Sequence, residues 1–273
     1  MELEFWGVRG TMPSPGPEKV RYGGHTHCTS VRTAEGATLV IDAGTGIKDL
    51  GTRLMTEAGA AGDAPVNVVL LLTHFHIDHI IGLPLFGPLF SPRASITFYS
   101  AAEPEAAERY LGGLMTGPYF PVDLEATPAA KRFKKVIPGL TIGGIQISSC
   151  PLIHPQGNVA YRLEFGGQRI VSATDTEHPV KGVDPKLADL SAGATHLIYD
   201  ATFTPEEYAA GRKGWGHSTW LAGTELAAAA GAGHLVLSHY SPDHSDERVD
   251  GILAAARAKF PQTSAASQGL KLR

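Results

Sequence analysis

Cysteine is scarce in this sequence, which has only Cys28 and Cys150 among its 273 residues. Two cysteines make neither the disulfide framework of a small secreted domain nor a zinc cage built of thiolates. Both are expected to pack as small buried side chains. A metal site in this chain would therefore take its ligands from imidazole and carboxylate groups.

Long hydrophobic runs are also absent. No apolar stretch reaches about 18 residues, the length that a membrane-spanning helix needs. The first residues, 1–5, show no basic stretch followed by an apolar core, so we expect no signal peptide. These features predict a soluble, cytoplasmic protein that does not contact a membrane.

Positive charge is not in excess, because 23 Lys and Arg stand against 27 Asp and Glu and give a net charge of -4. Proteins that follow the phosphates of a nucleic acid usually present a basic surface. The charge balance therefore gives no indication of broad, non-specific nucleic-acid binding.

Hydrophobic residues make up 43% of the chain, which is enough for a substantial core. Apolar runs typical of strands alternate with segments of helical spacing, so the class is α/β. No linker or low-complexity tract divides the chain, and we expect a single domain over residues 1–273. Strands are predicted at residues 3–8, 27–33, 38–41, 66–73, 94–99, 145–149, 159–165, 169–173, 195–199 and 234–238, and helices at 47–58, 104–115, 205–210, 218–230 and 247–260. Residues 34–37 are the expected turn of an early hairpin, and residues 263–273 a tail or short strand.

The densest group of chemically active side chains is the stretch His-Phe-His-Ile-Asp-His at residues 74–79. It follows the near-continuous apolar run 66–73, which is typical of a strand buried on both faces. Binding sites in open α/β sheets lie at the carboxyl ends of strands. Histidine and aspartate ligands suit Zn²⁺, Mn²⁺ or Fe²⁺. The sequence therefore predicts a metal site where this strand ends.

Four other apolar segments of the second half also lead directly into a histidine or an aspartate. If these strands share one end of a sheet, their terminal side chains converge on one crevice. Strand ends are often polar because loops are polar, but that explanation does not account for the repeated choice of these two residue types. The four residues are His154, Asp175, Asp200 and His239.

The spacing His-x-His-x-Asp-His resembles the signature of the metallo-β-lactamase fold superfamily. The resemblance implies a four-layer αββα sandwich that holds two metals, most often Zn²⁺, with Mn²⁺ or Fe²⁺ as alternatives. In the family pattern, each metal takes three ligands of its own and one carboxylate bridges both. Carried onto this sequence, the first metal takes His74, His76 and His154, the second takes Asp78, His79 and His239, and the bridge is Asp175.

One further carboxylate is a candidate for support of this site. Asp42 ends the strand at residues 38–41, so it can orient a ligating histidine through a hydrogen bond. Alternatively, it only forms the turn before Gly44.

The segment Gly-Trp-Gly-His-Ser-Thr at residues 214–219 resembles the His-Ser-Thr segment of the ribonuclease Z-like phosphodiesterase branch. Asp200 resembles the acidic residue that orients this histidine, although ribonuclease Z usually has glutamate there. The resemblance makes His217, Asp200 and Asp78 catalytic, with His217 protonating the leaving alkoxide. Ser218 and Thr219 are candidates for substrate binding, or they cap the following helix.

These features predict a dinuclear metal-dependent hydrolase, and more specifically a phosphodiesterase in which a metal-bound hydroxide attacks the substrate. Three alternatives remain open. One is a nuclease that processes RNA 3′ ends, another a thioester or lactam hydrolase, and the third a non-catalytic ligand sensor on the same fold.

The expected substrate is a small phosphodiester such as a cyclic nucleotide or a cyclic phosphate. Ribonuclease Z grips tRNA with a long basic arm between its isolated histidine and its bridging carboxylate, but Asp175 follows His154 by only 21 positions in this sequence. We therefore expect no extended nucleic-acid surface. Tyr119 and Phe120, in the longer interval before His154, are expected to narrow the entrance and contact the substrate. Proteins of this kind are often homodimers, so self-association is expected too.

Overall fold

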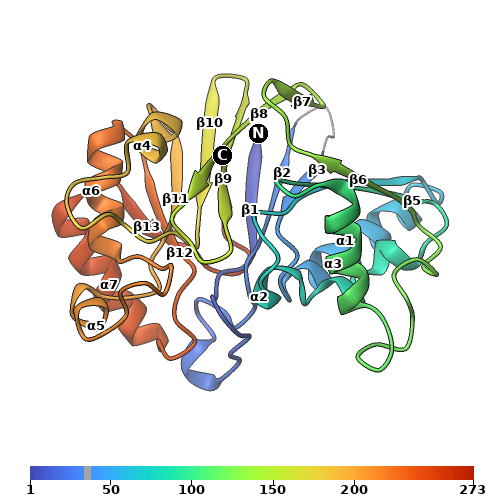
Figure 1. Cartoon of the computed structure of the whole chain (residues 1–273), viewed down its shortest axis with the longest axis horizontal. Helices are drawn as coiled ribbons and strands as arrows, with labels where there is room; N and C mark the ends of the chain where they lie inside the picture. The colour runs from blue at the N-terminus through green and yellow to red at the C-terminus, as the bar shows by residue number, and fades with distance from the viewer. Residues whose placement is uncertain (34–37) are drawn as a thin grey trace.

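The computed structural model describes residues 1–33 and 38–273, and it places two seven-stranded sheets face to face with helices on both outer sides (Figure 1). This arrangement confirms the predicted αββα sandwich. The turn expected at residues 34–37 lies outside the described residues. The prediction of a single domain over residues 1–273 stays a prediction.

The first sheet is mixed. Its strands follow the order β14-β1-β2-β3-β4-β5-β6, and β3 to β6 run parallel. Strand β14 pairs with β1, so the two ends of the chain lie side by side, as Figure 1 shows. The strands are β1 (Glu2–Gly7), β2 (Cys28–Arg32), β3 (Thr38–Ile41), β4 (Val66–Leu71), β5 (Ala94–Ser100), β6 (Ala130–Lys135) and β14 (Lys271–Leu272).

The second sheet is also mixed. Its order is β13-β12-β11-β10-β9-β8-β7, in which β10 to β13 run parallel. Strand β9 is antiparallel to both of its neighbours, so β8 points in the same direction as β10. The strands are β7 (Leu140–Ile142), β8 (Ile145–Leu152), β9 (Asn158–Phe165), β10 (Gln168–Ala173), β11 (His196–Asp200), β12 (Leu235–Ser238) and β13 (Thr263–Ala265).

Helices cover the outer face of each sheet. Figure 1 shows α1 (Ile47–Ala60) and α3 (Pro104–Leu114) outside the first sheet, and α4 (Pro185–Ser191), α6 (Trp220–Ala230) and α7 (Asp246–Lys259) outside the second. The shorter helices lie in the loops: α2 (Ile77–Ile80), α5 (Pro205–Ala209), η1 (Pro17–Lys19), η2 (Leu83–Leu85) and η3 (Gly87–Phe90). Among the described residues, no helix has the length and apolar character to cross a membrane.

Two hydrophobic clusters hold these layers together. The larger one contains inward-facing residues of both sheets, such as Phe5 and Tyr161, together with side chains of α6 and α7. The smaller one joins α1 and α3 to the first sheet through residues such as Leu50, Phe98 and Leu111. Burial of this much apolar surface drives the packing of the layers.

The strands that carry the predicted site residues end on one side of the sandwich. Strand β3 is parallel to β4, and β8, β10, β11 and β12 share one direction in the second sheet. The chain leaves β4 into α2, which lies near the middle of the lower half of the molecule in Figure 1. The face-to-face packing therefore brings the carboxyl ends of these strands, from both sheets, close together.

Candidate metal centre

Three histidines from two different sheets form the first group of metal-type ligands. The ligand atoms of His74, His76 and His154 all lie within 4.8 Å of one another. His76 donates its Nε2 hydrogen to Gln156 at 2.8 Å, and His154 donates from Nδ1 to the carbonyl of Gly216 at 2.8 Å. Because these outer nitrogens are engaged, the inner ones, His76 Nδ1 and His154 Nε2, face each other at 3.1 Å.

The second group lies deeper and combines imidazoles with carboxylates. The ligand atoms of Asp78, His79, Asp175 and His239 meet the same 4.8 Å limit, and all four residues are buried. Asp78 Oδ2 lies 3.3 Å from His79 Nε2 and 3.4 Å from His239 Nε2. The main-chain N–H of Thr11 donates to the same oxygen at 2.7 Å, which fixes its direction.

Asp175 lies between the two groups. Its Oδ1 is 4.0 Å from the Nε2 atoms of His74 and His154. Its Oδ2 is 3.0 Å from His79 Nε2 and 2.9 Å from His239 Nε2. One carboxylate thus faces both groups, as a bridging ligand would, and the structure brings all seven predicted ligands into one cluster.

The atoms of this cluster fit a divalent cation. The Nε2 atoms of three histidines and Oδ2 of Asp175 are buried without a hydrogen-bond partner among the described residues; the histidines are His74, His79 and His239. Buried polar atoms are costly unless something binds them. Imidazole and carboxylate ligands suit Zn²⁺ and similar ions. The cluster therefore supports binding of divalent metals.

The electrostatics of the two groups differ. Burial lowers the pKa of His74 and of His154, so both rings are neutral and have a free lone pair. Burial acts in the same direction on His79 and His239, but the neighbouring carboxylates, foremost Asp175, outweigh it. They raise the pKa of His79 well above its usual value and the pKa of His239 to about 10. Metal binding to the second group therefore competes with protons.

Backbone conformation aims several of these side chains. Asp42, Asp175 and His239 each follow a strand and have a positive φ, of 61°, 57° and 60°. Residues other than glycine rarely adopt this left-handed region, and such positions concentrate at functional sites. The sharp turn at the end of each strand directs the side chain into the cluster.

Asp42 supports the second group through hydrogen bonds. Its Oδ2 accepts from His79 Nδ1 at 2.8 Å and from the hydroxyl of Thr73 at 2.8 Å, and the residue is fully buried. These hydrogen bonds are those that the predicted supporting role requires, and the role itself stays a prediction. The carboxylate holds the His79 ring so that Nε2 points into the cluster.

Replacing Asp42 by asparagine is expected to weaken metal affinity about 10–100-fold, the usual cost of losing such a supporting group. Competition with a chelator measures this affinity. Asp63→Asn is the matched control, because Asp63 has a φ of 62° but is exposed and forms an ion pair with Arg93 at 2.8 Å. Unchanged affinity in Asp42→Asn would leave this residue with the turn-forming role alone.

His217 adjoins the cluster without belonging to either ligand group. Its Nδ1 donates to Asp200 Oδ2 at 3.2 Å and lies 3.7 Å from Asp175 Oδ1. Asp200 also accepts from the main-chain N–H groups of Asp175, Thr202 and Ser218. Burial raises the pKa of Asp200, but the hydrogen bond and charge of His217 outweigh it and lower the pKa overall. The same pairing outweighs burial at His217 and raises the pKa of the imidazole.

The loop that carries His217 is held by a residue that the sequence analysis missed. The Glu177 carboxylate accepts from the main-chain N–H groups of Gly214 and Gly216 at 2.8 and 3.1 Å. Gly216 has a φ of 80°, and a Cβ there would lie 2.4 Å from His154 Nδ1. The short sequence distance from Asp175 to Glu177 was the available signal for this role.

The four residues predicted to bind substrate have their side chains in other surroundings than the ligand cluster. The hydroxyl of Ser218 is buried between Tyr199 and His178, at 2.9 Å from each, and Thr219 caps α6. Tyr119 is 80% exposed, and Phe120 packs against the smaller core cluster. Within the described part of the chain, none of these four side chains forms a hydrogen bond with the seven clustered residues. Their role in substrate binding stays a prediction.

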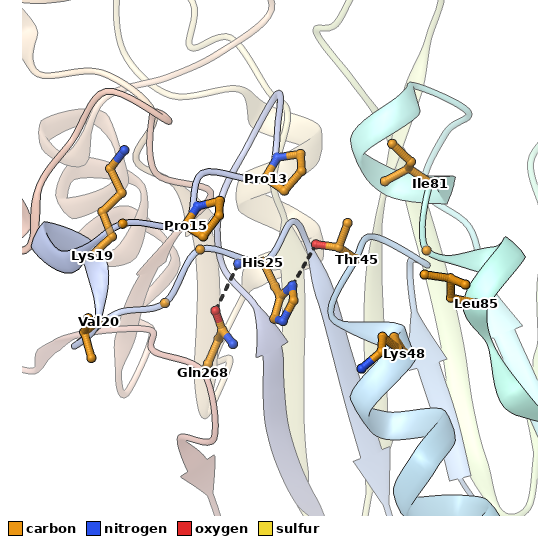
Figure 2. A pocket seen from close by; sticks show the side chains of 14 residues that line it. Pro13, Pro15, Lys19, Val20, His25, Thr45, Lys48, Ile81, Leu85 and Gln268 are labelled. Carbon is orange, nitrogen blue, oxygen red and sulfur yellow. Dashed lines mark hydrogen bonds between the residues drawn. The ribbon is translucent and has the colours of Figure 1, made fainter.

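Two further histidines near the start of the chain, His25 and His27, have different surroundings. His27 is fully buried near Asp42, and burial lowers its pKa to about 4. His25 lines a hollow of about 520 Å³ between the loop of Pro13 and Pro15 and the segment of η2. Figure 2 shows His25 hydrogen-bonded to Thr45 and Gln268 in this hollow. None of the seven clustered ligands lines it.

Comparisons with known proteins agree with this arrangement. A family model described as the beta-lactamase superfamily domain matches residues 37–240. Ribonuclease Z from Bradyrhizobium sp. (strain ORS 278) is 26% identical over 322 residues, which cover 97% of each chain. The metallo-beta-lactamase fold protein YhfI from Bacillus subtilis superposes with a TM-score of 0.73 at 19% identity, over 99% of this chain and 98% of that one. Human tRNase Z, short form, superposes with a TM-score of 0.69 at 17% identity, over 100% and 99%.

These relatives correct one prediction from the sequence. The expectation of a small-molecule substrate and no extended nucleic-acid surface is wrong, because relatives matched along nearly the whole chain are ribonucleases. The hairpin of β9 and β10 does fill the interval between His154 and Asp175. However, the lack of an arm at one place and a balanced net charge do not exclude local contacts with a nucleic acid, because binding depends on the charges near the strand.

Proposed function

This chain belongs to the beta-lactamase superfamily, and on that premise we propose that it is an RNA-processing nuclease that hydrolyses phosphodiester bonds. Its membership confirms the predicted metal-dependent hydrolase of the metallo-β-lactamase fold. The full-length similarity to ribonuclease Z favours RNA as the substrate.

We propose that two divalent ions, with Zn²⁺ as the first candidate, occupy the cluster. His74, His76 and His154 would hold one ion, and Asp78, His79 and His239 the other, with Asp175 between them. Ions in such a site act as Lewis acids and lower the pKa of bound water towards 7.

The observation that carries the proposal is the position of the His217–Asp200 pair beside Asp175. A hydrolase of amides or thioesters has less need of a separate acid next to two metals than a phosphodiesterase with an alkoxide leaving group. Asp200 holds Nδ1 of His217, so Nε2 is the nitrogen that is free to donate a proton. The raised pKa of His217 keeps that proton available near neutral pH.

The proposed reaction is the hydrolysis of a phosphodiester bond. A water oxygen forms a new bond to phosphorus, and the bond between phosphorus and the leaving oxygen breaks. The leaving oxygen takes a proton from His217 Nε2, and the proton lost by the water restores the imidazolium through the solvent. Asp200 stabilises the charged ring and keeps it oriented throughout.

The proposed ligand set predicts two metal ions per chain. Elemental analysis of gently purified protein, repeated after dialysis against excess Zn²⁺, measures the number. A stoichiometry that stays at one under saturation would sink the dinuclear proposal, even if the protein remained active.

The proposed reaction is tested by assay of the metal-loaded protein against labelled RNA that carries a 3′ extension. A chromogenic lactam and a glutathione thioester serve as comparison substrates, since both are hydrolysed by other enzymes of this fold type. RNA cleavage that is lost on chelation and restored by metal is expected. Turnover of the lactam or thioester with none of the RNA would contradict the proposal.

A further inference from the structure

A second hollow, of about 620 Å³, opens directly beside His217. We call it the Trp215 pocket and define it by Phe203, Glu207, Arg212, Trp215, His217 and Arg248. Its walls come from the loop after β11, from α5 and the loop that follows it, and from the start of α7. The first three segments follow one another in the sequence, but α7 comes only after β12, so the folded chain is needed to close this pocket.

An indole and a guanidinium form one wall of the pocket. The Arg212 guanidinium carbon lies 4.4 Å from the ring centroid of Trp215, and this indole is 54% exposed although it is large and apolar. The ring of Phe203 meets the indole edge-on, with centroids 6.4 Å apart and planes at 75°. Exposed aromatic rings beside an arginine provide flat surfaces on which nucleobases stack.

The two arginines of the pocket differ in their partners. Arg248 lies 3.0 Å from the Glu207 carboxylate, which also contacts His244 at 3.1 Å. Among the described residues, Arg212 has no carboxylate within ion-pair distance, and its side chain makes no hydrogen bond. Its N–H groups are therefore available to a phosphate, while those of Arg248 are partly used.

The aromatic wall is continuous with the proposed general acid. The rings of Phe203 and His217 lie 5.9 Å apart at 81°, so Phe203 contacts both Trp215 and His217. Another hollow, of about 780 Å³, is lined by His74 and His76 of the first ligand group but not by His217. Of these two hollows, the Trp215 pocket is the one that His217 lines.

We propose that the Trp215 pocket binds the nucleoside that carries the leaving oxygen of an RNA substrate. Its base stacks against Trp215 and Arg212, and Arg212 contacts the next phosphate of the strand. The inference rests on the proposed function: the leaving oxygen takes its proton from His217, so the nucleoside that carries this oxygen must lie next to His217. It assigns a subsite for a single-stranded ribonucleotide and an orientation of the strand across the cluster.

Trp215→Ala is expected to raise the KM for RNA, or the Kd for product, by about 5–150-fold, the value of one base stacked on an aromatic ring. Trp215→Phe retains a ring and should lose less. The same measurement on RNA whose leaving nucleoside lacks its base forms a double-mutant cycle, in which the effect of Trp215→Ala should shrink markedly. A structural role of Trp215 would give equal losses on both substrates and would overturn the proposal.

Trp6→Phe is the matched control, because Trp6 also carries an arginine, Arg53, at 4.3 Å but lies outside the pocket. Its affinity for RNA should match that of the wild-type protein. Calorimetric titration of the metal-loaded protein with ribonucleoside monophosphates gives a second readout that needs no turnover. Binding that Trp215→Ala weakens is expected, and binding that this variant leaves unchanged would overturn the inference.

The titration also separates the two proposals. If RNA is not cleaved but nucleotides bind in a Trp215-dependent manner, the proposed reaction fails and the subsite stands. If RNA is cleaved with equal KM by the wild-type protein and Trp215→Ala, the reaction stands and the subsite fails.

Discussion

Asp175→Asn is expected to lower kcat/KM on RNA by about 10³-fold or more. The substitution removes the charge that faces both ligand groups, at 2.9–3.0 Å from His79 and His239 and 4.0 Å from His74 and His154. Lewis-acid stabilisation by bound metal is worth several kcal/mol, and each 1.36 kcal/mol is tenfold in rate. The substitution weakens both ligand groups at once, so most of this Lewis-acid stabilisation should be lost.

Metal content is the second measurement on this variant. Asparagine keeps the shape of the side chain and tolerates the left-handed φ of 57° at this position, so the fold should survive. We expect fewer than two metals per chain at a Zn²⁺ concentration that saturates the wild-type protein. Asp63→Asn again serves as the control, because Asp63 shares this backbone conformation at the surface. Full metal content together with full activity in Asp175→Asn would refute the bridging role.

His217→Ala is expected to lower kcat by about 10²–10⁴-fold, the usual contribution of a positioned general acid. Because Nδ1 is held by Asp200 and the imidazole is outside both ligand groups, the metal content should stay at the wild-type value. Metal loss in this variant would instead make His217 a ligand together with Asp200 and His239, since the ligand atoms of these three residues also lie within 4.8 Å of one another.

The leaving group gives a sharper test of the same residue. An ester whose leaving alcohol has a low pKa needs less protonation, so it should restore part of the rate of His217→Ala. His196→Ala is the control, since His196 is half-buried at the start of β11 and its ring lies 5.7 Å from that of His234, tilted at 55°. A loss that is equal for good and poor leaving groups would exclude the role of general acid.

The sequence predicted those elements whose pattern is local. The apolar run before His74 became β4, and the periodic segments at residues 47–58 and 247–260 became α1 and α7. Strand β6 was missed because Lys131, Arg132, Lys134 and Lys135 hide its pattern, as is common at the edge of a sheet. The short α4 and β7 were missed too, because brief elements carry little periodic signal.

The errors about substrate have a different origin. The net charge is a property of the whole chain, and the interval from His154 to Asp175 concerns a single possible insertion. Neither describes the particular groups near the cluster that a nucleic acid would contact. Arg212 and Trp215 lie three residues apart in the sequence, and nothing in their order shows that they stack beside His217. Ser218 looked equally available beside His217, but the packing of Tyr199 turns its hydroxyl into the protein.

The sequence by itself determined which candidate ligands the centre contains, because the identity of these residues and their places at strand ends are properties of the chain. The spacing in residues 74–79 and the series His154, Asp175, Asp200 and His239 were enough for that. Only the tertiary structure decided how these groups meet, since the distance between His74 and Asp175 depends on how two separate sheets pack. The same packing decided that Asp175 faces both ligand groups and that an aromatic pocket adjoins His217, because these contacts join residues that no local pattern relates.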